Sequence, residues 1–142
     1  MKKVELRTAT IADAVSEAFG EIQALAEEMR EAFDNTPESL QSSVAGEARG
    51  EAADNLEQIE EVDVPDALKD VQLQWQDAHE AKGRRGLSRS KRRENAISIL
   101  QSVMSLLDEN EDSESDENSE FYTALENAIG EMESVEFPGM YG

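Results

Sequence analysis

Apolar residues between positions 10 and 33 recur at alternating spacings of four and three: Ile11, Val15, Ala18, Ile22, Leu25, Met29 and Ala32. This spacing places them on one face of an α-helix, whereas a strand would need every second residue. Thr10 precedes the pattern and Asp13 follows three residues later, which is a variant of the capping box. The sequence therefore predicts a helix over residues 10–33. Phe19 and Phe33 widen its apolar face and favour a bundle over a coiled coil.

A second helix is predicted from Pro37, which suits the first helical position because its missing N–H has no partner there anyway. The helix extends to about residue 61, so it matches the first in length and should pair with it antiparallel. Its inward-facing residues are predicted to be Leu40, Val44, Ala48, Ala52, Leu56 and Ile59. Gly46 and Gly50 each weaken a helix by about 1 kcal/mol relative to alanine. Together with neighbouring alanines they also form a smooth Gly/Ala strip that a second backbone can approach closely, and both interpretations stay open.

Three more helices complete the predicted bundle. The first begins at Pro65 and carries Leu68, Val71, Trp75 and Ala78 on one face. The next starts near Ser88 or Ser90, ends near Leu107, and is the most apolar segment, so we expect it to be the best buried. A short last helix spans 120–132, with Phe121, Leu125, Ala128, Ile129 and Met132 facing inward.

The predicted fold class is all-α: an antiparallel bundle of four main helices, arranged as two αα-hairpins, plus a short C-terminal helix and an extended tail. Residues 10–132 would form a single domain that includes an acidic linker at 108–119. Residues 1–9 are an N-terminal arm, and 133–142 are a C-terminal tail.

Charge is sorted along the chain. The 33 acidic and 13 basic residues give a net charge of −20 and a pI near 4.2, and there is no cysteine, which excludes disulfides and thiolate metal sites. The segment 82–93 is a dense basic turn, whereas 108–120 is strongly acidic. In an up-down-up-down bundle the basic turn would lie at the same end as residues 34–36, and the acidic linker would lie at the other end beside 60–66.

Two local patterns contain residues that could serve as chemical sites. His79 is the only histidine, and Gln76 precedes it by three residues where a di-iron motif has Glu, so a packed or rim histidine is favoured over a catalytic base or metal ligand. Residues 108–112 resemble the first ligands of a calcium-binding EF-hand loop, but Ser113 replaces the turn glycine and Ser119 the bidentate glutamate. We expect a solvated acidic linker that binds divalent cations loosely at most.

The sequence shows no phosphate-binding loop, nucleophile elbow or zinc-protease motif, so we predict a non-enzymatic protein without a cofactor, catalytic residue or metal site. The basic turn has no interleaved aromatic residue and the rest of the chain is acidic, so direct nucleic-acid binding is not expected. No secretory signal or membrane-spanning run is visible, so the expected location is the cytoplasm, the host cytoplasm if the protein is viral.

Two modes of protein–protein interaction remain. In the first, the acidic surface imitates the phosphates of nucleic acid and inhibits a basic nucleic-acid-handling protein; small, acidic, cysteine-free helical proteins of this kind resemble phage-encoded inhibitors in general character. The carboxylates predicted to bind such a partner are Glu47, Glu51, Asp54, Glu57, Glu61, Asp108, Glu111, Asp112 and Asp116.

In the second mode the protein is an assembly component that forms a homo-oligomer or docks on a neighbour through its basic turn, its Gly/Ala strip and its apolar tail. The predicted basic contacts are Lys82, Arg84, Arg85, Arg89, Lys91, Arg92 and Arg93, and the tail contacts are Phe137, Met140 and Tyr141. Low-affinity binding of divalent cations by a helical protein is a weaker third alternative.

Overall fold

The computed structural model describes residues 6–79, 87–109 and 116–136. The elements in chain order are β1 (Arg7–Thr10), α1 (Ile11–Asp34), α2 (Glu38–Gln41), α3 (Val44–Glu57), β2 (Gln72–Trp75), α4 (Arg89–Glu109) and α5 (Asp116–Glu133). The mostly helical fold confirms the broad prediction of a helical bundle. The elements differ from the predicted arrangement of four main helices in two αα-hairpins, because a turn and β2 stand where the third main helix was expected. None of the described helices is both long enough and apolar enough to cross a membrane.

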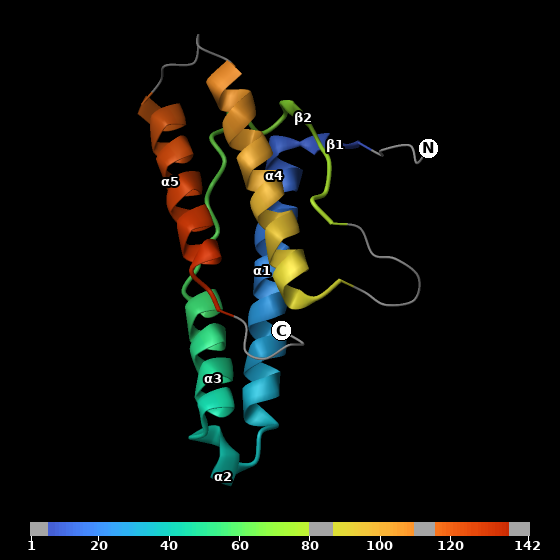
Figure 1. Cartoon of the computed structure of the whole chain (residues 1–142). Helices are drawn as coiled ribbons and strands as arrows, with labels where there is room; N and C mark the ends of the chain where they lie inside the picture. Colours follow the sequence, from blue (N-terminus) through green and yellow to red (C-terminus); the bar gives the residue numbers. More distant parts are fainter. Residues whose placement is uncertain (1–5, 80–86, 110–115, 137–142) are drawn as a thin grey trace, which may run out of the picture.

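Helix α1 is the central element. Thr10 caps it as predicted, since its hydroxyl accepts the N–H of Asp13 at 3.2 Å. The C-terminal half of α1 packs against α3, and its N-terminal half packs against α4 (Figure 1). Because α1 is covered on both halves, nine of its residues are buried, and it is α1 rather than α4 that lies deepest in the core. The expectation that the segment 88–107 would be the best buried is therefore wrong.

The second predicted helix divides into α2 and α3. Ser43 separates them and caps α3, because its hydroxyl accepts the N–H of Gly46 at 3.1 Å. Leu40 and Val44 were predicted to face inward, yet they are 52% and 88% exposed at this corner. Helix α3 ends at Glu57, so it covers only part of α1.

The interpretation of Gly46 and Gly50 as points of close approach is confirmed. A Cβ at position 46 would lie 2.3 Å from the carbonyl oxygen of Leu40, and one at position 50 would lie 3.0 Å from the ring of Phe33. Both glycines are buried. The two glycines of the Gly/Ala strip are therefore covered within the chain, Gly46 by α2 and Gly50 by α1.

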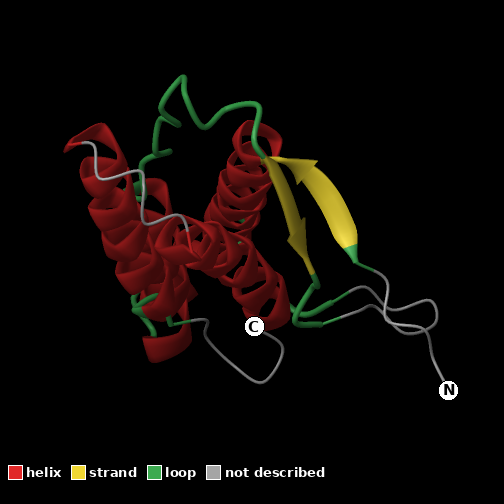
Figure 2. Ribbon diagram, turned by 90° about the horizontal axis from the view of Figure 1, so that it is seen from above, coloured by secondary structure: helices red, strands yellow, loops and turns green. Residues whose placement is uncertain are grey.

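The segment predicted as a helix from Pro65 is instead a turn followed by β2. Strand β2 pairs antiparallel with β1, Arg7 opposite Trp75 and Thr10 opposite Gln72 (Figure 2). Residues 72–75 alternate between exposed and buried, as a half-buried strand requires. The N-terminal residues 7–9, predicted to be part of an arm, supply the partner strand.

Hydrogen bonds to the start of α1 explain why residues 69–71 do not form a helix. The N–H of Ile11 donates to the carbonyl of Val71 at 2.8 Å, and the N–H of Ala12 donates to that of Lys69 at 3.4 Å. The first N–H groups of any helix lack partners within it, so these carbonyls satisfy donors that would otherwise be unpaired. A distant part of the chain thus decides the local structure.

Helices α4 and α5 form a hairpin beside the N-terminal half of α1. In Figure 1, α5 lies above α3 on the same side of the molecule. All five residues predicted to face inward from the last helix are buried: Phe121, Leu125, Ala128, Ile129 and Met132. Helix α5 begins at Asp116, four residues before the predicted start, and α4 continues to Glu109. The predicted acidic linker is therefore partly helical.

The 34–36 turn and the basic turn were predicted to lie at the same end of the bundle. The described residues of the basic turn do not lie there. Arg92, in the first turns of α4, contacts Glu21 and Glu28 of α1. Helix α4 therefore starts beside the middle of α1 and not beside its end. Lys82, Arg84 and Arg85 lie outside the described residues.

Candidate functional site: an acidic interaction surface

Two arginines of the predicted basic contact join α4 to α1 within the chain. Nη1 of Arg92 lies 2.6 Å from a carboxylate oxygen of Glu28, and its Nε donates to Glu21. Nε of Arg89 lies 3.6 Å from Glu28. Burial lowers the pKa of Arg92, but the hydrogen bonds that Arg92 donates to these two carboxylates raise it more, so the pKa lies above its ordinary value. A helix that begins with cations is thus accommodated by acidic neighbours on α1.

The other cations of the basic stretch differ in position. Arg93 donates to the carbonyl of Val135, which holds the residues after α5 against α4. Lys91 is exposed at the start of α4. The structure therefore leaves Lys91 as a solvent-facing member of the predicted basic contact, whereas Arg89, Arg92 and Arg93 serve the fold.

Cations elsewhere in the described chain are also engaged with neighbours. Arg30 of α1 forms ion pairs with Asp54 and Glu57 of α3, with Nη2 2.6 Å from Glu57. Arg7 of β1 lies 4.9 Å from the ring centroid of Trp75 and pairs with Asp77 at 3.2 Å. Such pairs join elements that are distant in sequence, so most cations of the described residues are engaged by groups of the same chain.

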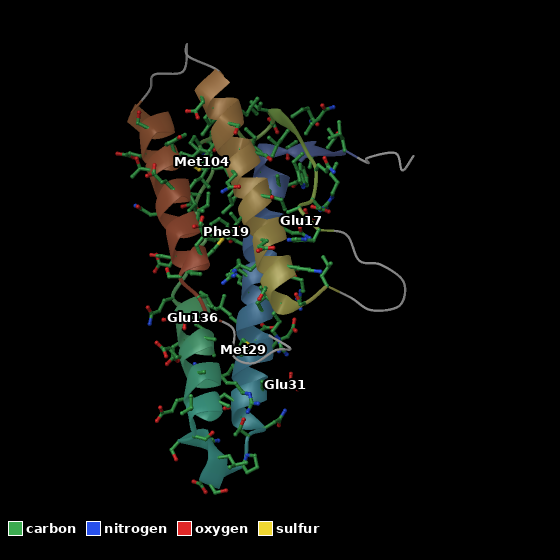
Figure 3. All side chains as sticks on the ribbon, viewed as in Figure 1. Glu17, Phe19, Met29, Glu31, Met104 and Glu136 are labelled. Atoms are coloured by element: carbon green, nitrogen blue, oxygen red, sulfur yellow. The ribbon has the colours of Figure 1, made fainter. Side chains whose placement is uncertain are left out.

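Carboxylates without a described ion pair dominate the outer surface. Figure 3 shows oxygen-tipped side chains projecting outward along α3 and α5. On α3, Glu47 and Glu51 are exposed and form no ion pair with a described residue, whereas Asp54 and Glu57 share Arg30. Glu47, Glu51 and Asp54 line a shallow cavity of about 560 Å³ over Phe33 and Gly50. The carboxylates predicted on this helix therefore lie on one accessible face.

The remaining predicted carboxylates are more scattered. Glu61 follows α3 and is exposed, and Asp108 is exposed near the end of α4. Asp116 begins α5, but its side chain lies outside the described residues, as do Glu111 and Asp112. The tail residues Phe137, Met140 and Tyr141 also lie outside them, so none of these predictions is tested.

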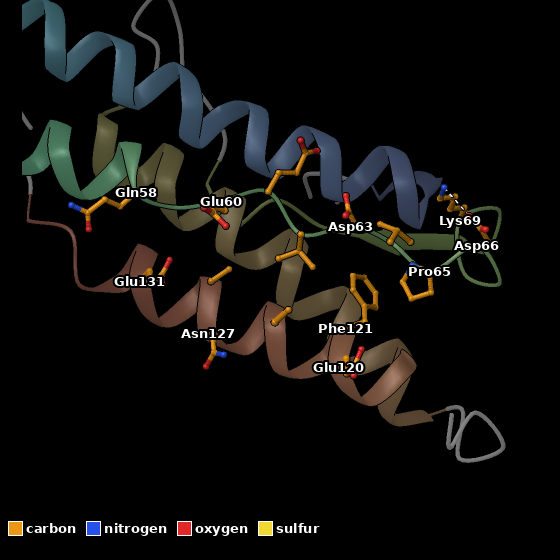
Figure 4. Close-up of a pocket in the computed structure, with 15 residues that line it drawn as sticks. Gln58, Glu60, Asp63, Pro65, Asp66, Lys69, Glu120, Phe121, Asn127 and Glu131 are labelled. Atoms are coloured by element: carbon orange, nitrogen blue, oxygen red, sulfur yellow. Dashed lines mark ion pairs between the residues drawn. The ribbon is translucent and has the colours of Figure 1, made fainter. Parts of the chain in front are cut away.

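A larger groove, not predicted from the sequence, lies between residues 58–69 and α5 (Figure 4). Its volume is about 880 Å³. Its walls carry six exposed carboxylates: Glu60, Glu61, Asp63, Asp66, Glu120 and Glu131. Among the described residues that line it, Lys69 is the one cation, and it pairs with Asp66 at 2.8 Å.

The groove could not be predicted from the sequence because its two walls are distant in the chain. Residues 58–69 were expected to be the end of one helix and the start of the next. The other wall, α5, was expected to be a separate short helix. The local signal that was available is the alternation of Val62, Asp63 and Val64, which is typical of an extended segment. In the structure both valines are half-buried against the core.

Tyr122 of α5 faces Asp108 near the end of α4, with 3.5 Å between the hydroxyl and a carboxylate oxygen. The negative charge of Asp108 raises the pKa of this tyrosine, with smaller contributions from burial and from Glu126. Because the chain has only two tyrosines, replacing Tyr141 by phenylalanine leaves Tyr122 as a single reporter.

In that background we expect Tyr122 to titrate above the ordinary value of about 10. Asp108→Asn should lower the pKa, and Glu126→Gln should lower it less. The folded state binds the phenolic proton more tightly than the unfolded state does, so the associated stability is present below the unfolded pKa and is lost as the pH rises through the folded pKa. Ultraviolet titration of phenolate measures the pKa, and equal values in the parent and in Asp108→Asn would contradict the contact.

His79 anchors a loop to α4. Its backbone N–H donates to Oδ1 of Asn95 at 2.8 Å, and Nδ2 of Asn95 donates back to its carbonyl at 2.9 Å. Its ring also contacts Glu94. This arrangement agrees with the rim position favoured from the sequence. Within the described residues, no group of three or more histidine, aspartate or glutamate side chains is arranged to hold a metal ion.

Comparison with protein-family models, with curated proteins and with solved structures finds no match for this chain.

Proposed function

We propose that this protein is a non-enzymatic, cytoplasmic inhibitor of phage type that binds a basic nucleic-acid-handling protein by imitating the phosphates of nucleic acid. The observation that carries the proposal is the separation of charge in the described chain: most cations are held in internal contacts, and carboxylates without partners face outward. Such a surface attracts a cationic groove and repels nucleic acid itself.

The geometry of α3 supports the same proposal. Glu47, Glu51 and Asp54 recur at helical spacing, which places them about 5 Å apart along the axis. DNA presents its phosphates at intervals of about 3.4 Å per strand, so the two arrays are of similar scale. The helix packs closely against α1, since Gly50 lies against the ring of Phe33 and Ala53 is buried. A basic groove can therefore meet several carboxylates at once.

The experiment uses the full chain, immobilised, to capture basic proteins from a cell extract at low salt. We expect duplex DNA to displace the captured partner, because protein and DNA would occupy the same groove. A partner that holds DNA and this protein at the same time would rule out mimicry.

Charge reversal on α3 gives the matched variant. Glu47→Lys together with Glu51→Lys should lower capture by about tenfold or more at low ionic strength, because two attractive contacts become repulsive. The control is Glu27→Lys together with Glu126→Lys, which changes the net charge equally at exposed positions on α1 and α5. Equal loss in both double variants would mean that net charge alone governs binding.

Assembly of several copies is the second candidate function. The observation that favours it is the exposed apolar pair Leu40 and Val44 at the corner between α2 and α3. Light scattering on a sizing column at about 50 mM and 500 mM salt tests it, because that range spans weak to strong screening. A monomer at both concentrations would rule it out. Arg92 is unsuitable for charge reversal here because it joins α4 to α1, so Lys91→Glu is the better variant.

A further inference from the structure

The groove between residues 58–69 and α5 has two unlike surfaces. Its rim is acidic, whereas its base includes the buried ring of Phe121 and the half-buried side chains of Val64, Pro65 and Ala124. In Figure 4, Gln58 and Glu131 lie toward one end and Pro65, Phe121 and Glu120 toward the other. A ligand would therefore find apolar contact along the base and negative charge on both sides.

The backbone of residues 60–64 forms no hydrogen bond with a described residue. Its five N–H groups and five C=O groups are unpaired within the part of the chain that the structure describes. The segment is irregular in its hydrogen bonding yet alternates exposed and half-buried side chains at Asp63 and its two valine neighbours. An extended segment with unpaired backbone is a surface on which a further strand can be added.

We infer that this groove is the docking site for an extended segment of the partner in which cationic and apolar side chains alternate. The α5 wall from Glu120 to Glu131 is about 17 Å long, which accommodates about five residues of extended chain. Successive side chains of a bound strand point to opposite sides. One set would enter the apolar base, and the other would meet the carboxylates of the rim. The inference rests on the proposed function in that the partner is a basic protein, and it adds which part of that protein is held.

The probe is a fluorescein-labelled peptide of seven residues that alternates arginine and valine, and fluorescence anisotropy with the full-length protein measures its binding. The matched peptide has the same composition with the arginines clustered at one end. We expect the alternating peptide to bind about tenfold more tightly or better. Equal affinity for the two peptides would overturn the inference, because binding would then follow charge alone. The same holds if spermine displaces the labelled peptide as well as the unlabelled alternating peptide does at matched charge.

Two variants locate the binding site. Glu120→Lys together with Glu131→Lys reverses charge on the α5 wall and should weaken the alternating peptide by about tenfold or more. Ala124→Trp fills the groove without a change in charge and should weaken it similarly. The control is Glu27→Lys together with Glu126→Lys, with equal net charge outside the groove, for which we expect less than about threefold. Unchanged binding in the Glu120/Glu131 variant, or an equal loss in the control, would overturn the inference even if Ala124→Trp failed to fold.

The same variants separate this inference from the proposed function. If the groove variants still capture the DNA-displaceable partner while the α3 variant does not, the groove inference is wrong and mimicry stands. If the groove variants lose the peptide but duplex DNA never displaces any captured partner, the groove stands and mimicry is wrong.

Discussion

Replacement of Leu73 by alanine is expected to lower the free energy of unfolding by about 2–5 kcal/mol. Leu73 and Trp75 are 2% and 4% exposed and point to the same side of β2. Truncation would leave a cavity where β2 meets the helical core. Equilibrium unfolding in urea measures the change, and the single tryptophan, Trp75, reports on the same region by fluorescence.

Ala78→Ser and Gln74→Ala are the controls, because both side chains are exposed and should change stability by less than about 0.5 kcal/mol. The set also distinguishes a strand from a helix. A helix would place Ala78 on the buried face with Trp75 and would turn Leu73 away from it. A large loss from Ala78→Ser with little from Leu73→Ala would contradict the β1–β2 pairing.

Gly46→Ala is expected to destabilise the protein by about 1–3 kcal/mol. The new Cβ would lie 2.3 Å from the carbonyl oxygen of Leu40 and 2.7 Å from that of Gln41. Both atoms belong to the backbone of α2, so no side chain can rotate away, and α2 must shift relative to α3. Thermal or urea unfolding measures the loss.

Gly130→Ala is the matched control, because it places the same methyl group on a helix where no atom lies within 4 Å. Alanine is a better helix former than glycine, so this variant should stabilise the protein by up to about 1 kcal/mol. If the two variants changed stability in the same direction, the close approach of α2 to α3 would be wrong.

Helices whose apolar face recurs over many residues were predicted well from the sequence. The spacing from Ile11 to Ala32, the Thr10 cap and the inward face of the last helix all reappear in the structure. The reason is physical: a long amphipathic stripe can be buried in only one way, whatever it packs against. The exposed carboxylates Glu47 and Glu51 were placed on the surface for the same reason.

Segments decided by distant contacts could not be predicted. Residues 65–78 fit a helical pattern of apolar positions, but Lys69 and Val71 accept the free N–H groups of α1, and β1 pairs with β2. Likewise, Leu40 and Val44 fit the inward face of a continuous helix, yet Ser43 begins a new one. Local pattern is a weak guide where long-range hydrogen bonds compete with it.

The sequence by itself determined that this chain is acidic, mostly helical and built around the helix at 10–33, because charge and long periodicity are local properties of the chain. Only the tertiary structure decided where the charges act. It pairs Arg92 with α1, Arg30 with α3 and Arg7 with Asp77, which follows β2, so carboxylates of the same chain neutralise those cations. It also brings residues 58–69 beside α5 to form the acidic groove, since two walls so far apart in sequence become neighbours only through packing.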